Sequence, residues 1–279
     1  MKKFDGDPEK HIPAILYKYR DWNDPHNRRL VESNEVYFAS PKSFNDPYDC
    51  RITDRFIKRS RKELDQYINT MAIEHFQDTE RMGQNFEHVL KDFESRVFDT
   101  ANYQKEQDEI HFKMQDDYFG VLSLTKRWNS ILMWSHYSNF HQGFCVGIKG
   151  PSLLAIGRQR GKGGKVFYKT KYPDLPLRIV SKMSEEEMIE RMFIETHTKA
   201  AHWRYEKEYR VTKNFFGLAN IDRRDYLPEG SITEIILGIS MPDNHKEEIK
   251  QLAKNKKIKI YQAKKVPFRF EIDREEINF

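Results

Sequence analysis

Two carboxylates separated by one residue stand in the segment Trp203 to Arg210, which reads WRYEKEYR. Alternate residues of a β-strand share a face, so a strand here would group Glu206 and Glu208 with Arg204 and Arg210. The ordinary alternative is a solvated strand face whose ion pairs contribute at most about 1 kcal/mol each. The flanking tryptophan and tyrosines favour partial burial instead, and a buried pair of carboxylates points to acid–base or charge-stabilising chemistry.

A second chemically rich segment runs from Trp134 to Gly147 and reads WSHYSNFHQGFCVG. The Asn-Ser pair that precedes Ile131 can cap a helix carrying His136 and Tyr137, and GFCVGI is apolar enough to be a buried strand. With His141 on the connecting turn, three polar side chains would gather near one strand end, where sites are commonly built. The alternative is a packing face of aromatic residues with a core histidine whose hydrogen bonds are satisfied.

The N-terminal part offers groups for anion recognition. Arg20 ends LYKYR, the first expected strand, and a guanidinium at a strand end can hold an anion through two hydrogen bonds. The loop SPKSFNDPYD adds the polar residues Ser40, Asn45, Asp46 and Asp49. The Asn-Asp-Pro run also favours a tight turn, because Asn and Asp side chains bond their own backbone and proline fixes φ.

A mixed sheet is expected to position these groups. Runs rich in β-branched and aromatic residues predict strands at 14–19, 35–39, 118–125, 143–148, 165–170, 202–215, 232–239, 257–266 and 268–272. Helices are expected at 28–33, from Ile131, from the capping box of Ser184 and Glu187 to Ala201, and at 242–255.

The segment from about 52 to 117 differs in character from the rest of the chain. It has no proline, one glycine, many charges and apolar residues at helical spacing, which predicts two or three helices. We therefore expect one α+β domain over residues 1–279: a mixed, largely antiparallel sheet core with a helical insert at 52–117.

Composition narrows the class of protein. In the chain of 279 residues, the 13% share of aromatic residues argues against disorder. The net charge of +5 fits binding of a polyanion or a phosphate-bearing small molecule without requiring it. Cys50 and Cys145 form neither a disulfide framework nor a zinc site. The N-terminus lacks an apolar signal segment, and no apolar run approaches a membrane span of roughly 18 residues, so a cytoplasmic protein is expected.

Familiar catalytic motifs are absent from the sequence, which contains no HExxH, no paired CxxC and no GxSxG. The glycine-rich basic run GRQRGKGGK (157–165) only loosely resembles a phosphate cradle, because it lacks the order GxxxxGK[ST]. We expect a flexible hairpin loop there, with a ligand contact as the alternative.

The segments LYKYR, VYFASPKSFNDPYD, MWSHYSNFHQGFCVGI, KVFYKT and WRYEKEYR, in this order, resemble an uncharacterised bacterial family, the domain of unknown function numbered 2971. The likeness extends from about Leu16 to Arg210, and it is most specific in FNDPYD, WSHYSNFHQGFC and YEKEYR. The helical insert carries little of it. The family implies no activity.

The opening of the chain also resembles, more faintly, the start of the ADP-ribosyltransferase fold. That resemblance implies that Arg20 grips NAD, that Ser40 or Tyr137 shapes the nicotinamide pocket, and that the run Glu206-Lys207-Glu208 supplies the catalytic glutamate. Breaking the bond to nicotinamide creates an oxocarbenium-like centre that a carboxylate stabilises. The His-Gly-Thr and Ser-Thr-Ser forms of the fold's motifs are absent from this chain.

The expected function is that of an NAD-using enzyme, a mono-ADP-ribosyltransferase or NAD glycohydrolase, which would suit a bacterial toxin or anti-phage effector. Its partner is a nucleotide; a protein or nucleic-acid acceptor stays open. A metal-dependent nuclease is an alternative, with oxygen and nitrogen ligands from Asp46, Asp49, His136, His141, Glu206 and Glu208. A non-enzymatic module that binds a ligand or a protein is another.

The candidate residues divide by expected role. The expected catalytic residues are Glu206, Glu208, His136 and Tyr137. The expected ligand-binding residues are Arg20, Ser40, Asn45, Asp46, His141 and Arg210. No metal ligand is assigned in the favoured interpretation.

Overall fold

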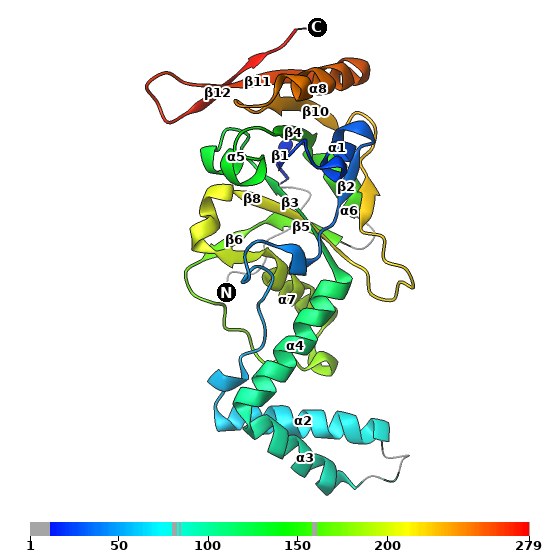
Figure 1. Ribbon diagram of the computed structural model, residues 1–279. Coiled ribbons are helices and arrows are strands. Elements are labelled where there is room, and N and C mark those ends of the chain that lie inside the picture. Colours follow the sequence, from blue (N-terminus) through cyan, green and yellow to red (C-terminus); the bar gives the residue numbers. More distant parts are fainter. Residues whose placement is uncertain (1–11, 80–82, 84, 158–160, 279) are drawn as a thin grey trace.

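The computed structural model describes residues 12–79, 83, 85–157 and 161–278 (Figure 1). An eight-stranded sheet in the order β12-β11-β10-β4-β1-β3-β8-β5 forms its centre. The pairing within it is antiparallel except between β10 and β11, so the expected α+β fold with a mixed, largely antiparallel sheet is confirmed. The strands are β1 (Ile15–Arg20), β3 (Phe119–Thr125), β4 (Phe144–Lys149), β5 (Gly161–Lys165), β8 (Glu208–Asn214), β10 (Ile232–Leu237), β11 (Lys259–Lys265) and β12 (Ile272–Glu276).

Two short strand pairs flank this sheet. One joins β2 (Glu35–Tyr37) to β9 (Arg224–Tyr226), and the other joins β6 (Phe167–Lys169) to β7 (Thr198–Ala200). The helices outside the insert are α1 (Pro25–Glu32), α5 (Ile131–Tyr137), α6 (Gly150–Gly157), α7 (Glu185–His197) and α8 (Asp243–Lys256). In the described part of the chain, no helix is long and apolar enough to cross a membrane.

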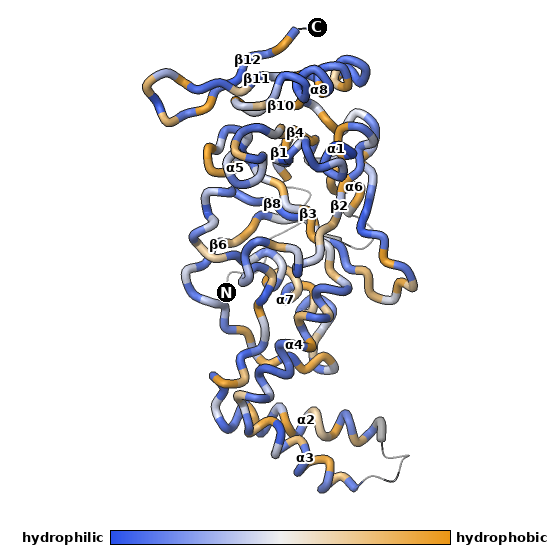
Figure 2. The backbone as a smooth tube through the Cα atoms, in the orientation of Figure 1, coloured by the Kyte–Doolittle hydropathy of each residue, from blue (hydrophilic) through white to orange (hydrophobic). Residues whose placement is uncertain are grey.

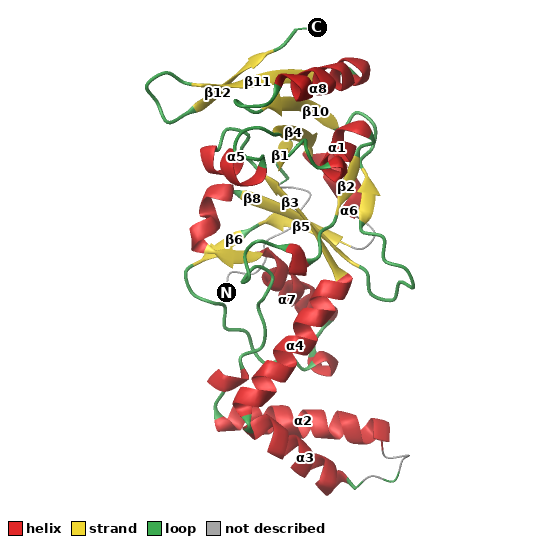
Figure 3. Ribbon diagram, viewed as in Figure 1, coloured by secondary structure: helices red, strands yellow, loops and turns green. Residues whose placement is uncertain are grey.

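The helical insert projects from one end of the sheet (Figure 1). It contains α2 (Arg61–Thr79), α3 (Phe86–Phe98) and α4 (Thr100–Tyr118), and α4 runs directly into β3. The insert has its own small core, in which Phe56 packs against the rings of Tyr67 and Tyr103. Figure 3 shows the red helices α2 and α3 apart from the yellow central sheet, with α4 leading from them to it.

Alternation along the central strands gives each face of the sheet its own core. On β4, Phe144 and Val146 join the larger cluster, which also receives residues of α1, α6 and α8, while Cys145 joins the cluster beneath α5. Helix α8 is coloured hydrophilic along most of its length in Figure 2, and only a few of its residues, such as Ile249, are buried. Both faces are therefore covered around β1 and β4.

The prediction of a strand over residues 202–215 is wrong for its first half. Ala201–Glu206 forms the 3-10 helix η6, and β8 begins only at Glu208. Lys207 between them has φ 47°, a left-handed conformation that breaks strand alternation. Arg204 is consequently exposed and does not share a face with Arg210.

Other boundaries also move. The strand expected at 268–272 begins at Ile272, because Phe268 adopts φ 59° and turns the chain. In the glycine-rich run, Gly161–Lys165 forms the edge strand β5 instead of a loop. Residues 158–160 of that run lie outside the described residues. The expected capping box of α7 is present in full.

Candidate functional site

The site is built where β1 and β3 separate. These strands are paired only at Tyr17 and Thr125, whereas β1 pairs with β4 along its whole length. Beyond Tyr17, Lys18 spans the opening with its own side chain, whose Nζ donates to the Ser123 carbonyl at 2.5 Å. A split of this kind leaves room for a cavity in the middle of a sheet that would otherwise be closed.

A cavity of about 470 Å³ occupies this split. Six of the ten expected site residues line it: Arg20, Asn45, His136, Tyr137, Glu206 and Glu208. They come from distant parts of the chain, namely β1, the loop after η2 (Pro41–Ser43), α5, η6 and β8. Asp49 and Lys199 also line the cavity.

The two glutamates converge, although not by strand alternation. The position of Glu208 is set by the register between β3 and β8, in which Glu208 pairs with Thr125. Glu206 precedes the left-handed Lys207, and the Thr125 hydroxyl donates to its backbone carbonyl. The Lys199 ammonium joins both side chains, with Nζ at 2.7 Å from Glu206 Oε2 and 3.5 Å from Glu208 Oε2.

A buried cation holds Glu208 from behind. Arg210 is fully buried and donates from Nε to Glu208 Oε1 at 2.8 Å and from Nη2 to Asp49 Oδ2 at 2.6 Å. Its Nη1 also donates to the Thr196 carbonyl at 2.6 Å. Arg210 does not line the cavity, so the structure places this expected ligand-binding residue as a support for two carboxylates.

These surroundings shift the two carboxyl pKa values in opposite directions. Burial raises the pKa of Glu206. Attraction to Lys199 lowers this pKa, but repulsion from Glu208 offsets part of that lowering. Burial alone would also raise the pKa of Glu208, but Arg210 and Lys199 together lower it below its usual range. Glu208 is therefore firmly ionised at neutral pH, and Glu206 is the group of the pair that exchanges a proton more readily.

Helix α5 brings an aromatic hydroxyl to the same glutamate. The Tyr137 hydroxyl donates to Glu206 Oε1 at 2.5 Å, and Asn45 lines the same cavity. His136 lies exposed at the cavity, and its Nδ1 is 2.9 Å from the Tyr205 hydroxyl. Ser130 caps α5 as expected, accepting from the Met133 amide at 3.4 Å.

Two cations of β1 face the cavity from another side. Among the described residues, no group forms a hydrogen bond or ion pair with the Arg20 guanidinium, and burial lowers its pKa to about 10. Burial and the neighbouring Arg20 likewise lower the pKa of Lys18. Asp24 attracts Arg20 only at longer range, and a partly buried guanidinium without a direct ion pair favours an anionic ligand beside it.

Three further expected residues do not line the cavity. Ser40 donates from Oγ to the Asp116 carbonyl at 2.7 Å, and Asp46 accepts from the Tyr48 amide at 3.0 Å within a turn. His141 lies at the left-handed end of α5, stacked against Trp134, with Nε2 at 3.2 Å from Ser135 Oγ. The expectation that Ser40, Asp46 and His141 bind the ligand is therefore wrong for this cavity: their contacts are structural, and Asp46 forms the Asx turn that the Asn-Asp-Pro run also favours.

Sequence reasoning overlooked Lys18, Tyr37 and Lys199, although all three line the cavity. Lys18 could have been found, because it stands two residues before Arg20 in an expected strand and shares its face. Nothing in the local sequence marks Lys199, since its role depends on three carboxylates brought together by tertiary structure.

The arrangement of ligand atoms bears on the metal alternative. Within the described ranges, no three His, Cys, Asp or Glu side chains are placed to hold a metal ion together. Asp46 and His141 lie off the cavity, and the Lys199 ammonium stands within 3.5 Å of carboxylate oxygens of Asp49, Glu206 and Glu208. A fixed cation therefore already occupies the place between these carboxylates.

Comparison with known proteins identifies one family. No curated protein and no solved structure matches the chain, and the likeness to the ADP-ribosyltransferase fold is not shown. A family model described as "Protein of unknown function (DUF2971)" matches residues 133–211, which include α5, β4, η6 and the start of β8. The earlier segments LYKYR and FNDPYD lie outside the match. The expected resemblance to the DUF2971 family is thus supported over residues 133–211.

Proposed function

We propose that this protein cleaves the N-glycosidic bond of NAD, as a mono-ADP-ribosyltransferase or an NAD glycohydrolase. One observation carries the proposal: Glu206 and Glu208 line the same cavity with pKa values shifted in opposite directions, and the unpaired Arg20 lines that cavity too. Pairs of titratable groups whose surroundings separate their pKa values are typical of acid–base sites.

The chemistry requires little beyond these groups. When the bond between the ribose C1′ and the nicotinamide nitrogen breaks, both electrons leave with nicotinamide, which departs as a neutral molecule and needs no acid. The positive charge that develops at C1′ is stabilised by the ionised carboxylates. Water or an acceptor then bonds to C1′, and its proton passes to Glu206, whose raised pKa suits a general base.

The neighbouring residues support Glu206 in distinct ways. The Tyr137 hydroxyl fixes one carboxylate oxygen and Lys199 fixes the other. Glu208 contributes charge beside them and is itself held by Arg210. Arg20 is placed to hold a phosphate of the nucleotide, because a guanidinium binds phosphate oxygens through paired hydrogen bonds. An enzyme that consumes NAD would suit a toxin or an anti-phage effector.

The test is nicotinamide release from NAD by the purified protein, with chelator present. We expect release by the wild type and a loss of about 10²-fold or more in Glu206→Gln, the range for removal of a general base. Glu234→Gln is the matched control: Glu234 is also buried, accepts from a tyrosine (Tyr17, 2.8 Å) and pairs with a cation (Arg274, 2.6 Å), but it does not line the cavity.

Wild-type protein that releases no nicotinamide, with or without protein and nucleic-acid acceptors, would refute the proposal. A non-enzymatic binding module is then the next candidate, and one observation favours it: Lys199 and Arg210 already pair with Asp49, Glu206 and Glu208, as in a structural ion network. Nuclease activity is checked in the same preparation, as cleavage of RNA or DNA that requires added Mg²⁺ or Mn²⁺.

A further inference from the structure

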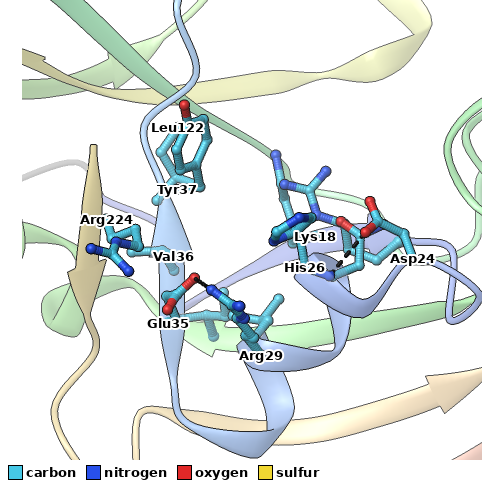
Figure 4. A pocket seen from close by; sticks show the side chains of 13 residues that line it. Lys18, Asp24, His26, Arg29, Glu35, Val36, Tyr37, Leu122 and Arg224 are labelled. Carbon is cyan, nitrogen blue, oxygen red and sulfur yellow. Dashed lines mark hydrogen bonds and ion pairs between the residues drawn. The ribbon is translucent and has the colours of Figure 1, made fainter. Parts of the chain in front are cut away.

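A second cavity, of about 540 Å³, adjoins the first. It lies between α1, β2 and β9, and Figure 4 shows Arg29, Glu35 and Arg224 on one side of it and Lys18, His26 and Asp24 on the other. Its lining and that of the first cavity share the residues Lys18, Arg20 and Tyr37. Each cavity has a volume within the roughly 300–1,000 Å³ of small-molecule sites.

The junction of the two cavities carries two cations without a direct ion pair among the described residues. Asp24 acts on Arg20, and Glu206 and Glu208 act on Lys18, only through longer-range attraction. Lys18 and Arg20 stand two apart on β1 and so share a face, and the Lys18 ammonium bonds only a backbone carbonyl among the described residues. No ion pair of Arg20 is formed with any of the residues described. Two neighbouring cations that are partly removed from water favour a doubly charged anion bridging them.

The rest of the second cavity has no unpaired cation among its described arginines and is partly apolar. Its cations are already paired: Arg29 with Glu35 at 3.6 Å, and Arg224 with Asp222 at 2.8 Å. Its remaining lining includes the apolar side chains of Leu30, Val36, Leu122 and Ile148. The half-exposed ring of Tyr37 stands where the cavities meet. Such a lining suits an uncharged, largely flat group with a few polar edges, as a nucleoside has.

We propose that the substrate is a dinucleotide that spans both cavities, with its pyrophosphate at Lys18 and Arg20 and its second nucleoside in the cavity between α1, β2 and β9. The proposal rests on the proposed function, which puts the reacting glycosidic bond beside Glu206 in the first cavity. It adds that the non-reacting half of the substrate has a built site of its own. Tyr37 and Arg224 would then determine affinity without taking part in the reaction.

The experiment compares the binding of pyrophosphate and ADP by calorimetry, since neither contains the scissile bond. We expect ADP to bind at least tenfold more tightly than pyrophosphate. Tyr37→Ala should remove that advantage and leave pyrophosphate binding unchanged, while Arg20→Gln should weaken both at least tenfold. Tyr37 is half exposed, so its truncation leaves the fold intact. Arg269→Ala, at an exposed loop arginine far along the chain, is the control.

The outcomes separate this inference from the proposed function. Equal affinity for ADP and pyrophosphate, or a Tyr37→Ala variant that weakens both alike, would overturn the inference even if NAD is cleaved. In that case nicotinamide mononucleotide, which fills only the first cavity, should be cleaved with the same KM as NAD. Tight, Tyr37-dependent ADP binding without any nicotinamide release would instead refute the cleavage chemistry and retain the nucleoside site.

Discussion

The two glutamates of the cavity should respond very differently to the same neutral substitution. Glu208 is held by Arg210 through bonds of 2.8 and 3.0 Å and by Lys199 at 3.5 Å. Glu208→Gln removes one anion from this buried group, and breaking a buried pair costs about 3–5 kcal/mol. Because Asp49 still pairs with Arg210, we expect the lower end, about 3 kcal/mol, or a melting temperature lower by about 6–12 °C.

Glu206→Gln should be much milder. The amide loses a charge-assisted bond from Lys199, which contributes about 1.5–3 kcal/mol. Against this, a neutral side chain no longer suffers the burial and the repulsion from Glu208 that raise the pKa of Glu206, an effect of about 1.4 kcal/mol for each pKa unit. The Tyr137 hydroxyl keeps an acceptor. The net loss should stay below about 1.5 kcal/mol.

Urea unfolding at pH 7 and again near pH 5 tests this contrast. A carboxyl whose pKa is raised by folding is disfavoured while ionised, and the folded state gains stability as pH falls through that raised pKa toward 4.5. The difference in the free energy of unfolding between the wild type and Glu206→Gln should therefore change between pH 7 and pH 5. Equal losses for Glu206→Gln and Glu208→Gln would refute the assignment of different charge states to the two groups.

Four further outcomes are expected. The value of kcat/KM for nicotinamide release should fall as pH drops through a pKa above 4.5, because Glu206 must be ionised to accept a proton. Lys199→Met should lower stability by about 3–5 kcal/mol in urea unfolding at pH 7, since three carboxylates lose their shared cation, and by less near pH 4. Gly143→Ala should cost about 1–3 kcal/mol in thermal unfolding, because a Cβ there would lie 2.1 Å from the Arg20 carbonyl oxygen. Arg20→Gln should leave the ligand-free protein at least as stable in the same measurement while binding of pyrophosphate is lost, since its pKa is lowered by burial and no described residue pairs with it.

Local sequence signals predicted most of the elements and much of the cavity. The capping box at Ser184, the cap at Ser130 and the apolar strand expected at 143–148 all follow from short-range chemistry, and each is present, the strand as Phe144–Lys149. Glu206 and Glu208 were grouped correctly, but the stated reason, strand alternation, does not hold across the left-handed Lys207. A non-glycine residue with positive φ is uncommon and has no reliable sequence signature.

The rest of the site depends on contacts that no local pattern encodes. The split between β1 and β3 decides that Lys18 and Arg20 face a cavity, and it arises because these strands pair at a single position. The burial of Arg210 depends on Asp49, which is 161 residues away in the chain. From the sequence, Arg210 was expected to contact the ligand, as an exposed arginine could. In the structure it is buried and holds Glu208 and Asp49 instead.

The distribution of charge around the cavities provides a further argument for the substrate class. At one side, the three carboxylates of Asp49, Glu206 and Glu208 outnumber the two cations Lys199 and Arg210 that pair with them. At the junction with the second cavity, Lys18 and Arg20 form no direct ion pair with a described carboxylate, although Asp24 attracts Arg20 at longer range. A ligand with a positive ring at one end and a pyrophosphate in its middle matches this order of charges, and NAD has that order. A ligand with only negative charge, such as a nucleic-acid backbone, would place phosphates against the carboxylates, which repulsion opposes.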